Sequence, residues 1–359
     1  MTVSSLHIIG AKKSGGAERF FIRLTTGLAE KGHPVHAIIP PGAEIDKELP
    51  AIVPRTHIKM SNVYDIFSRR KINKLINTLN PAIVQTYMGR ATRLTHVNKK
   101  QPSVHLARLG GYYNLKGYRH ADAWVGNTRK ICQYLVDNGF ASDRVFCIGN
   151  FTDIPDRHTA TQLAALRQRH AIPGNAWLLL SVSRLHHNKA VDTLLKALSS
   201  LPADIQQRPV HLLVLGEGPE QGRLLALCKK LKLETRVHWA GWQTRPNLFY
   251  QAADLFICPS RHEPLGNVIL EAWANQVPVI STHTDGADAL LTDRRNGRLV
   301  DIDAPEQLAT AIQELLQSSP QDIEAMVRNA NQVLQDNHSK EAIVDAYLQL
   351  YTKLSAQAK

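Results

Sequence analysis

The stretch that says most about the fold is residues 259–271, which read Pro-Ser-Arg-His-Glu-Pro-Leu-Gly-Asn-Val-Ile-Leu-Glu. It follows the apolar run Leu255–Cys258, which is typical of a buried strand. Pro264 disfavours the helical conformation for the residue before it, so the Glu263 carboxylate is expected in a loop. A helix is expected to begin near Gly266, with its first backbone N–H groups lacking acceptors within the helix. The stretch therefore predicts a strand, a loop at its carboxyl end, and a helix.

The same alternation of short apolar runs and longer amphipathic segments extends over the whole chain. The first half predicts strands at 6–9, 35–39, 82–84, 103–107 and 123–125, with helices at about 17–31, 69–79 and 128–138. The second half predicts strands at 177–182, 211–215, 237–239 and 278–280, with helices from about 191 and at about 222–232. Alternating strands and helices indicate α/β domains with parallel sheets. We expect two doubly wound, Rossmann-like domains facing a central cleft, with the ligand at the carboxyl ends of the strands.

The chain has 359 residues, which suggests two domains at a prior of ~150 residues each. We assign residues 1–153 to an N-terminal domain and 174–337 to a C-terminal domain. Asp153, Pro155, Asp156 and Pro173 flank one short helix, and apolar periodicity weakens there. Residues 154–173 are therefore expected to be a linker.

Composition excludes several classes of protein. Hydrophobic residues make up 43% and charged residues 21%, which fits a folded enzyme rather than a disordered chain. No apolar run approaches the ~20 residues that span a bilayer, and the first ten residues are too short and polar for a signal peptide. The four cysteines are scattered without a C-x-x-C pair, so we expect reduced thiols, no zinc site and a cytoplasmic protein.

The positive charge is concentrated in one half of the chain. Residues 1–153 contain 22 Lys and Arg against 10 Asp and Glu, whereas residues 154–359 contain 21 of each sign. The first half is therefore expected to attract an anionic partner. Nucleic acid, an acidic membrane leaflet and a phosphate-bearing substrate all fit, and charge alone does not choose among them.

Two glycine-containing loops follow predicted strands. In the first, Gly15 and Gly16 open a helix, which suits either anion binding or a tight turn. In the second, Gly216-Glu-Gly-Pro219, the third glycine falls at 222, where a dinucleotide fingerprint requires residue 221. We interpret the second loop as a structural turn.

Two further segments carry charges suited to a sugar nucleotide. Arg184 and Lys189 follow the strand 177–182 and could neutralise a diphosphate, although surface cations are more often only solvated. Glu263 and Glu271, eight residues apart beside a helix N-terminus, suit a ligand with hydroxyls at both ends and phosphates in the middle. We interpret His262 as a plain loop histidine.

Four motifs in this order make the chain similar to the retaining glycosyltransferases of family 4, which have the GT-B architecture. The motifs are Gly15-Gly-Ala-Glu18, Ser183-Arg-Leu with Lys189, Gly216-Glu-Gly-Pro219, and Pro259-Ser with Glu263-x7-Glu271. The resemblance covers about residues 6–310. It implies a metal-independent enzyme without a cofactor that keeps the α configuration of its donor sugar.

The resemblance also assigns roles to residues. Arg184 and Lys189 would hold the diphosphate, Glu263 would contact the donor sugar, and Glu271 would bind the ribose hydroxyls. The remaining donor contacts would come from backbone around Leu265, Gly266, Asn267 and Val268, with Gly15 and Gly16. Residues 338–359 would form a helix that packs back on the N-terminal domain.

The chain departs from the family pattern at three places. Ala190 stands where a glycine is usual, Gln85-Thr86-Tyr87 where many members have His-x-His, and Leu109 where some have a histidine. The sequence therefore leaves open whether a side chain of the N-terminal domain assists catalysis. Asp301-Ile-Asp303 imitates the D-x-D of metal-dependent transferases, but its late position beside a helix start indicates a turn and cap.

We expect a hexosyltransferase that uses a nucleotide sugar, with a UDP-sugar favoured, and a glycan or lipid-linked acceptor in lipopolysaccharide or other surface polysaccharide biosynthesis. The basic half, with Arg69, Arg70, Lys71 and Lys74 on one helix, suggests an anionic acceptor and contact with the inner face of the cytoplasmic membrane. The alternatives are a non-enzymatic protein that binds nucleic acid or another anionic polymer, a sugar-nucleotide epimerase, and a dinucleotide-dependent oxidoreductase. No nucleic-acid motif is present, and the glycine spacing at 216–222 disfavours the oxidoreductase.

Overall fold

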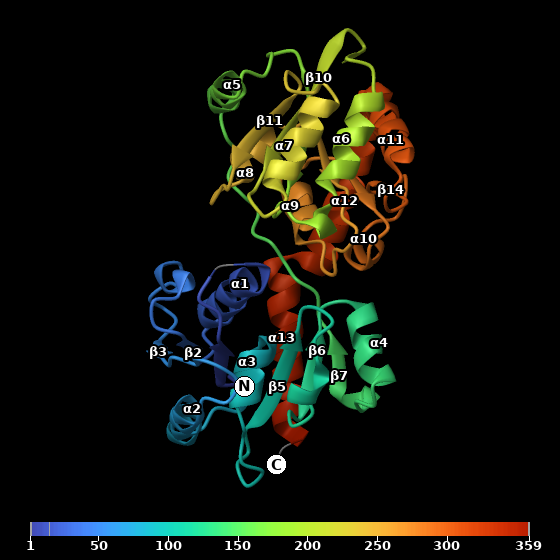
Figure 1. The fold of residues 1–359 in the computed structure, drawn as a ribbon. Helices are drawn as coiled ribbons and strands as arrows, with labels where there is room; N and C mark the ends of the chain where they lie inside the picture. Colours follow the sequence, from blue (N-terminus) through green and yellow to red (C-terminus); the bar gives the residue numbers. More distant parts are fainter. Residues whose placement is uncertain (1, 14, 358–359) are drawn as a thin grey trace. The chain divides into compact units, whose positions relative to one another are not determined.

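The computed structural model of the protein describes residues 2–13 and 15–357 and divides into two compact units (Figure 1). Unit 1 comprises residues 1–151 and 339–359, and unit 2 comprises residues 152–338. Each unit is a parallel sheet flanked by helices, so the prediction of two parallel-sheet α/β domains is confirmed. In the described part of the chain, no helix is both long and apolar enough to cross a membrane.

The sheet of unit 1 has the strand order β3-β2-β1-β4-β5-β6-β7, with all neighbours parallel. Its strands are β1 (Ser5–Ile9), β2 (Val35–Ile39), β3 (Arg55–His57), β4 (Ile83–Tyr87), β5 (Val104–Leu109), β6 (Ala123–Gly126) and β7 (Val145–Cys147). Its α-helices are α1 (Gly16–Glu30), α2 (Ile66–Leu79), α3 (Met88–Leu94), α4 (Arg129–Asp137) and α13 (Lys340–Gln357). The order reverses between β1 and β4, which is the place where doubly wound sheets bind ligands.

The C-terminal helix α13 is part of unit 1. Its Val344, Tyr347 and Tyr351 are fully buried in the same core cluster as Phe20 and Phe21 of α1. Figure 1 shows α13 (red) lying along the unit 1 sheet. Residues from opposite ends of the chain therefore share one hydrophobic core, whose burial stabilises both.

The main sheet of unit 2 has the order β11-β10-β8-β12-β13-β14, again parallel, and the short β9 pairs antiparallel with β10. The strands are β8 (Trp177–Val182), β9 (Asp204–Ile205), β10 (Arg208–Leu215), β11 (Val237–Gly241), β12 (Leu255–Cys258), β13 (Val279–Thr282) and β14 (Arg298–Val300). The helices are α5 (Ala160–Arg169), α6 (Val191–Ser200), α7 (Gln221–Lys230), α8 (Asn247–Ala252), α9 (Asn267–Ala274), α10 (Asp285–Leu290), α11 (Pro305–Gln317) and α12 (Pro320–His338). Here the order reverses between β8 and β12, so their carboxyl ends form the switch point of unit 2.

Residues 154–173 are not simply a linker, because unit 2 contains them. Thr159 and Gln162 form a reciprocal capping box at the start of α5, which fixes the helix end. Leu166 is 3% exposed and lies in the same core cluster as Phe249 of α8. Arg167 of the same helix donates to the Ala252 carbonyl at 2.9 Å and ion-pairs with Asp254, so apolar and polar contacts together attach α5 to the domain.

Ala190 adopts a left-handed backbone conformation, with φ 47°, between the short 3-10 helix η4 (His187–Lys189) and α6. This conformation strains any residue with a Cβ and suits glycine. Glycine adopts this conformation without strain, which explains why the family pattern has a glycine at this position.

Candidate functional site

The loops after β8 and β10 are joined backbone to backbone. Ser183 donates its N–H to the Leu215 carbonyl at 3.0 Å, and Leu185 donates to the Glu217 carbonyl at 2.9 Å. A Cβ on Gly216, whose φ is +126°, would lie 1.8 Å from the Ser183 carbonyl oxygen. A Cβ on Gly218 would lie 2.2 Å from the Leu185 carbonyl oxygen. The glycines of the Gly216–Pro219 motif thus allow close approach of the loop that carries Arg184, in agreement with a structural turn.

Lys189 and Glu263 meet at the switch point of unit 2. The Lys189 Nζ lies 2.5 Å from the Glu263 carboxylate, and the two side chains are 24% and 11% exposed. Burial alone would lower the pKa of Lys189, but the negative charge of Glu263 outweighs it and leaves the pKa raised. The two residues expected to contact the diphosphate and the donor sugar are therefore ion-paired with each other.

The helix α9 begins as the sequence predicts, immediately after Gly266. Gly266 has φ +67°, and a Cβ there would lie 2.8 Å from the Leu290 side chain and 3.2 Å from the Gly286 carbonyl oxygen. Gly286 in turn donates its N–H to the Glu263 carbonyl at 2.7 Å. The start of α10 therefore fixes the loop that precedes α9. The first amides of α9, around the half-buried Leu265, Asn267 and Val268, carry the partial positive charge of a helix N-terminus.

Arg184 and Glu271 differ in how strongly they are held. Arg184 is exposed, and its guanidinium makes no hydrogen bond or ion pair with any residue that the structure describes. Glu271, half-buried on α9, accepts from the hydroxyl of Tyr250 at 3.4 Å. Arg184 is thus available to a ligand, while Glu271 is oriented from α8.

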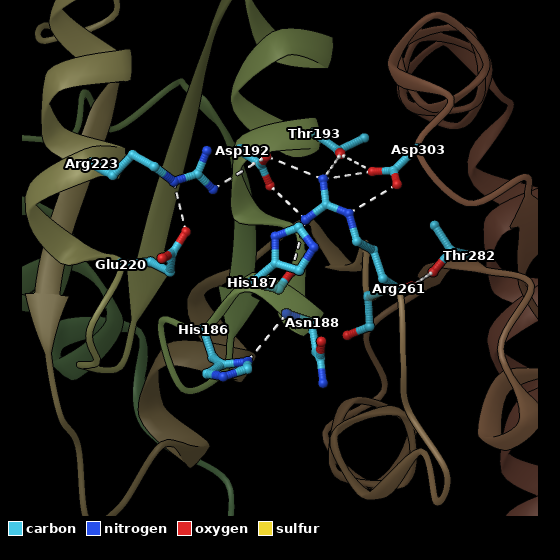
Figure 2. A network of polar contacts seen from close by, with 11 residues as sticks. His186, His187, Asn188, Asp192, Thr193, Glu220, Arg223, Arg261, Thr282 and Asp303 are labelled. Carbon is cyan, nitrogen blue, oxygen red and sulfur yellow. Dashed lines mark hydrogen bonds and ion pairs between the residues drawn. The ribbon is translucent and has the colours of Figure 1, made fainter.

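Sequence reasoning missed the residue that connects these loops, Arg261 (Figure 2). Its side chain is 17% exposed and ion-pairs with Asp192 of α6 and with Asp303, just before α11. The interpretation of Asp303 as part of a turn agrees with its φ of 57°, but its carboxylate also binds Arg261. The sequence offered one signal for this role: Arg261 is a cation in the same loop as Glu263, two residues before it.

The predicted glycines of unit 1 lie at the start of α1, where Gly15 is the N-cap; Ser14 lies outside the described residues. Glu18 is 5% exposed. Burial raises the pKa of Glu18 and outweighs the hydrogen bonds from the backbone N–H groups of Glu18 and Gly15, which lower it. The Glu18 carboxylate thus already accepts hydrogen bonds from amides at this helix N-terminus.

The three residues that replace His-x-His are core residues of β4. Tyr87 and Gln85 are buried, with the Tyr87 hydroxyl 2.9 Å from His7 Nδ1 and 2.8 Å from Gln85 Nε2. Tyr351 of α13 donates its hydroxyl to Gln85 Oε1 at 2.6 Å. This network holds α13 on the sheet and leaves these side chains inside the core.

Comparison with known families decides what kind of protein carries this site. The model for "Glycosyltransferase Family 4" matches residues 14–155, and the model for "Glycosyl transferases group 1" matches residues 163–346, just over half of the chain. The chain belongs to glycosyltransferase family 4. The sequence resemblance is therefore confirmed, and the epimerase, oxidoreductase and non-enzymatic alternatives are not supported.

Two relatives of this family 4 glycosyltransferase match it over nearly their whole length. The lipopolysaccharide core biosynthesis glycosyltransferase LpsE of Rhizobium meliloti (strain 1021) is 34% identical over 341 residues, covering 94% of this chain and 96% of LpsE. LpsD of the same organism is 29% identical over 342 residues, covering 94% and 95%.

Solved structures show the same fold at lower identity. A glycosyltransferase from Rickettsia africae ESF-5 superposes with a TM-score of 0.86 at 22% identity, covering 98% of each chain. Anabaena Alr3699/HepE in complex with UDP and glucose gives a TM-score of 0.83 at 19% identity, covering 98% of this chain and 100% of that one. The GT-B fold class of the family 4 glycosyltransferase is thereby confirmed.

Proposed function

We propose that this family 4 glycosyltransferase moves a hexosyl group from a nucleotide sugar, with UDP-hexose favoured, to an acceptor of the lipopolysaccharide core. The observation that carries the donor side is the Lys189–Glu263 pair, 2.5 Å apart at the switch point of unit 2. The acceptor class is supported by the full-length similarity to LpsE and LpsD, whose names state that role. The UDP choice is supported by the complex of HepE with UDP and glucose.

In this proposal each candidate donor-binding residue of unit 2 has one task. Arg184 and Lys189 neutralise the diphosphate, and the first amides of α9, from Leu265 to Val268, bind its oxygens. Glu271 accepts hydrogen bonds from the ribose hydroxyls. Glu263 exchanges its bond to Lys189 for a hydroxyl of the donor sugar when Lys189 turns to the phosphate.

The reaction breaks the bond between the anomeric carbon and the β-phosphate oxygen and forms a bond to an acceptor hydroxyl. We place attack on the same face as the leaving group, so that the α configuration is retained and the hydroxyl proton passes to the departing phosphate oxygen. Fixed cations and amides stabilise the charge on the leaving diphosphate. No metal is needed for that stabilisation.

Peripheral contact with an anionic membrane is part of the same proposal. Tyr64, Ile66 and Phe67, at the start of α2, are 84%, 62% and 77% exposed. The exposed Arg70 and Lys71 continue the same side of the helix, opposite the buried Ile72. An exposed apolar tip followed by cations is the pattern of a helix that lies in a membrane interface.

The test is a transfer assay with purified protein, truncated core oligosaccharides and UDP-, GDP- and ADP-hexoses, run in EDTA and again with Mg²⁺. The proposal expects transfer from a UDP-hexose in EDTA and a product whose new anomeric proton shows an α linkage by NMR. Transfer that requires metal, or a β product, would overturn the mechanism. Absence of transfer to every core acceptor would overturn the acceptor class.

A further inference from the structure

Arg261 joins three segments of unit 2 that are far apart in sequence: its own loop, residues 187–192, and Asp303. Its Nη1 donates to the His187 carbonyl at 2.7 Å, and Nη1 and Nη2 each lie 3.1 Å from an Asp192 carboxylate oxygen. Its Nε donates to Asp303 at 2.9 Å, and its Nη2 lies 2.6 Å from the other oxygen of Asp303. Figure 2 shows the guanidinium between these two carboxylates. All three of its nitrogens are thus used.

The two carboxylates are themselves held in place. Asp192 is 9% exposed and also lies 3.4 Å from Arg223 of α7, and Asp303 accepts from the Thr193 hydroxyl at 2.9 Å. Burial would raise the pKa of Asp192, but hydrogen bonds and the charge of Arg261 outweigh it and lower the pKa. The network is therefore ionised at neutral pH, and a planar guanidinium fits it in a way that an ammonium does not.

Main-chain bonds extend the connection to the two proposed donor-binding residues. The backbone N–H groups of Arg261 and His262 both donate to the Asn188 carbonyl, at 2.8 and 3.2 Å. Lys189 is the next residue after Asn188, and Glu263 is the second residue after Arg261. Arg261 thus contacts the loop after β8 through its side chain and its backbone, and these bonds tie the two loops together.

We propose that Arg261 is a positioning residue that, with Asp192 and Asp303, sets the distance between Lys189 and Glu263. Its role is to let Lys189 exchange Glu263 for the donor diphosphate without separation of the two loops. The inference rests on the proposed function, since it assumes that Lys189 and Glu263 meet the donor.

The first test uses the ligand-free protein and needs no substrate. Hydrogen exchange is measured for peptides covering 183–190 and 259–266 in wild type, Arg261→Lys and Arg298→Lys. Arg298 is the matched control, because it is 10% exposed and also binds two carboxylates, Asp293 and Glu314, but at the start of the edge strand β14. Arg261→Lys is expected to raise exchange in both peptides together, and Arg298→Lys in neither. Unchanged exchange in Arg261→Lys, or an equal rise in both variants, would overturn the proposal.

The second test separates positioning from general stability. Arg261→Lys is expected to lower kcat/KM for the donor roughly 10- to 100-fold, because small misplacements of binding groups have effects of this size. Arg298→Lys should leave kcat/KM within about twofold. In a Glu263→Gln background, Arg261→Lys should cause little further loss, since both changes act on the same pair. If the fold losses in kcat/KM from Arg261→Lys and Glu263→Gln multiply in the double variant, Arg261 does not act through Glu263. A wild type that transfers from no donor would refute the proposed function, while the exchange result would still decide the role of Arg261.

Discussion

Gly216→Ala tests most sharply how the site loops are built. The new Cβ would lie 1.8 Å from the Ser183 carbonyl oxygen, whereas real Cβ contacts are essentially never closer than 3.0 Å. The loops after β8 and β10 must therefore move apart by about 1.2 Å, the difference between these distances. The backbone bonds from Ser183 to Leu215 and from Leu185 to Glu217 cross this gap, so both should be lost or weakened.

The magnitude follows from these contacts. Each lost backbone hydrogen bond costs about 1 kcal/mol net, and alanine at a φ of +126° adds roughly 1–3 kcal/mol of strain. We expect the free energy of unfolding of unit 2 to fall by about 3–5 kcal/mol. Binding of the donor should weaken as well, because Arg184 lies in the displaced loop.

The assay is urea unfolding followed by tryptophan fluorescence. Four of the five tryptophans lie in unit 2 and one, Trp124, in unit 1, so the signal reports mainly on unit 2. Gly222→Ala is the control: nothing lies within 4 Å of a Cβ at Gly222 in α7, so alanine should stabilise by ~0.5–1 kcal/mol. If Gly216→Ala unfolds at the wild-type urea concentration, or if both variants lose the same stability, the argument from close approach is wrong.

Three further predictions concern other contacts. Asp65→Ala removes the N-cap of α2, which accepts from the Ser68 N–H at 3.0 Å, and should cost about 1 kcal/mol. Because hydrogen bonds lower the pKa of Asp65 to about 2, the wild-type advantage in thermal unfolding should be complete above about pH 4 and vanish as the pH falls toward 2. Lys189→Met leaves the carboxylate of Glu263 without its cation and should cost about 2–4 kcal/mol in urea unfolding; a double variant with Glu263→Gln should recover part of that loss, and no recovery would contradict the pairing. Gly27→Ala places a Cβ 2.7 Å from Val344 of α13 and should cost about 1–3 kcal/mol through overpacking; limited proteolysis that releases α13 no faster than in wild type would count against this packing.

The local parts of the site could be predicted from sequence because each depends on a short segment. Pro264 sets the loop conformation of Glu263, and the helix α9 begins after Gly266, as expected. The mismatched glycine spacing at 216–222 correctly indicated a turn. In all these cases the deciding residues lie within about ten positions of each other.

The contacts between loops could not be predicted in the same way. Lys189 and Glu263 are 74 residues apart, and Arg261 is 69 residues from Asp192 and 42 from Asp303. These pairs form because the strand order places β8 beside β12, and local patterns do not reveal which strands become neighbours. Asp303 therefore looked like part of a simple turn.

The misassigned linker has a different cause. The short helix expected in this segment is α5, but it buries a single large side chain, Leu166. So weak an apolar period does not show which domain the helix joins. The capping-box pair Thr159 and Gln162 indicates where the helix starts, but not what it packs against.

The central claim is that unit 2 binds a nucleoside diphosphate through Arg184 and Glu271 without metal. The measurement that tests it most directly is isothermal calorimetry in EDTA, with UDP, GDP and ADP titrated into wild type, Arg184→Ala and Glu271→Ala. We predict that one nucleoside diphosphate, UDP first, binds the wild type and that each variant weakens its affinity roughly tenfold or more, while thermal unfolding without ligand stays near that of wild type. If no nucleoside diphosphate binds in EDTA, or if both variants bind as tightly as the wild type, the donor site lies elsewhere and the account is wrong.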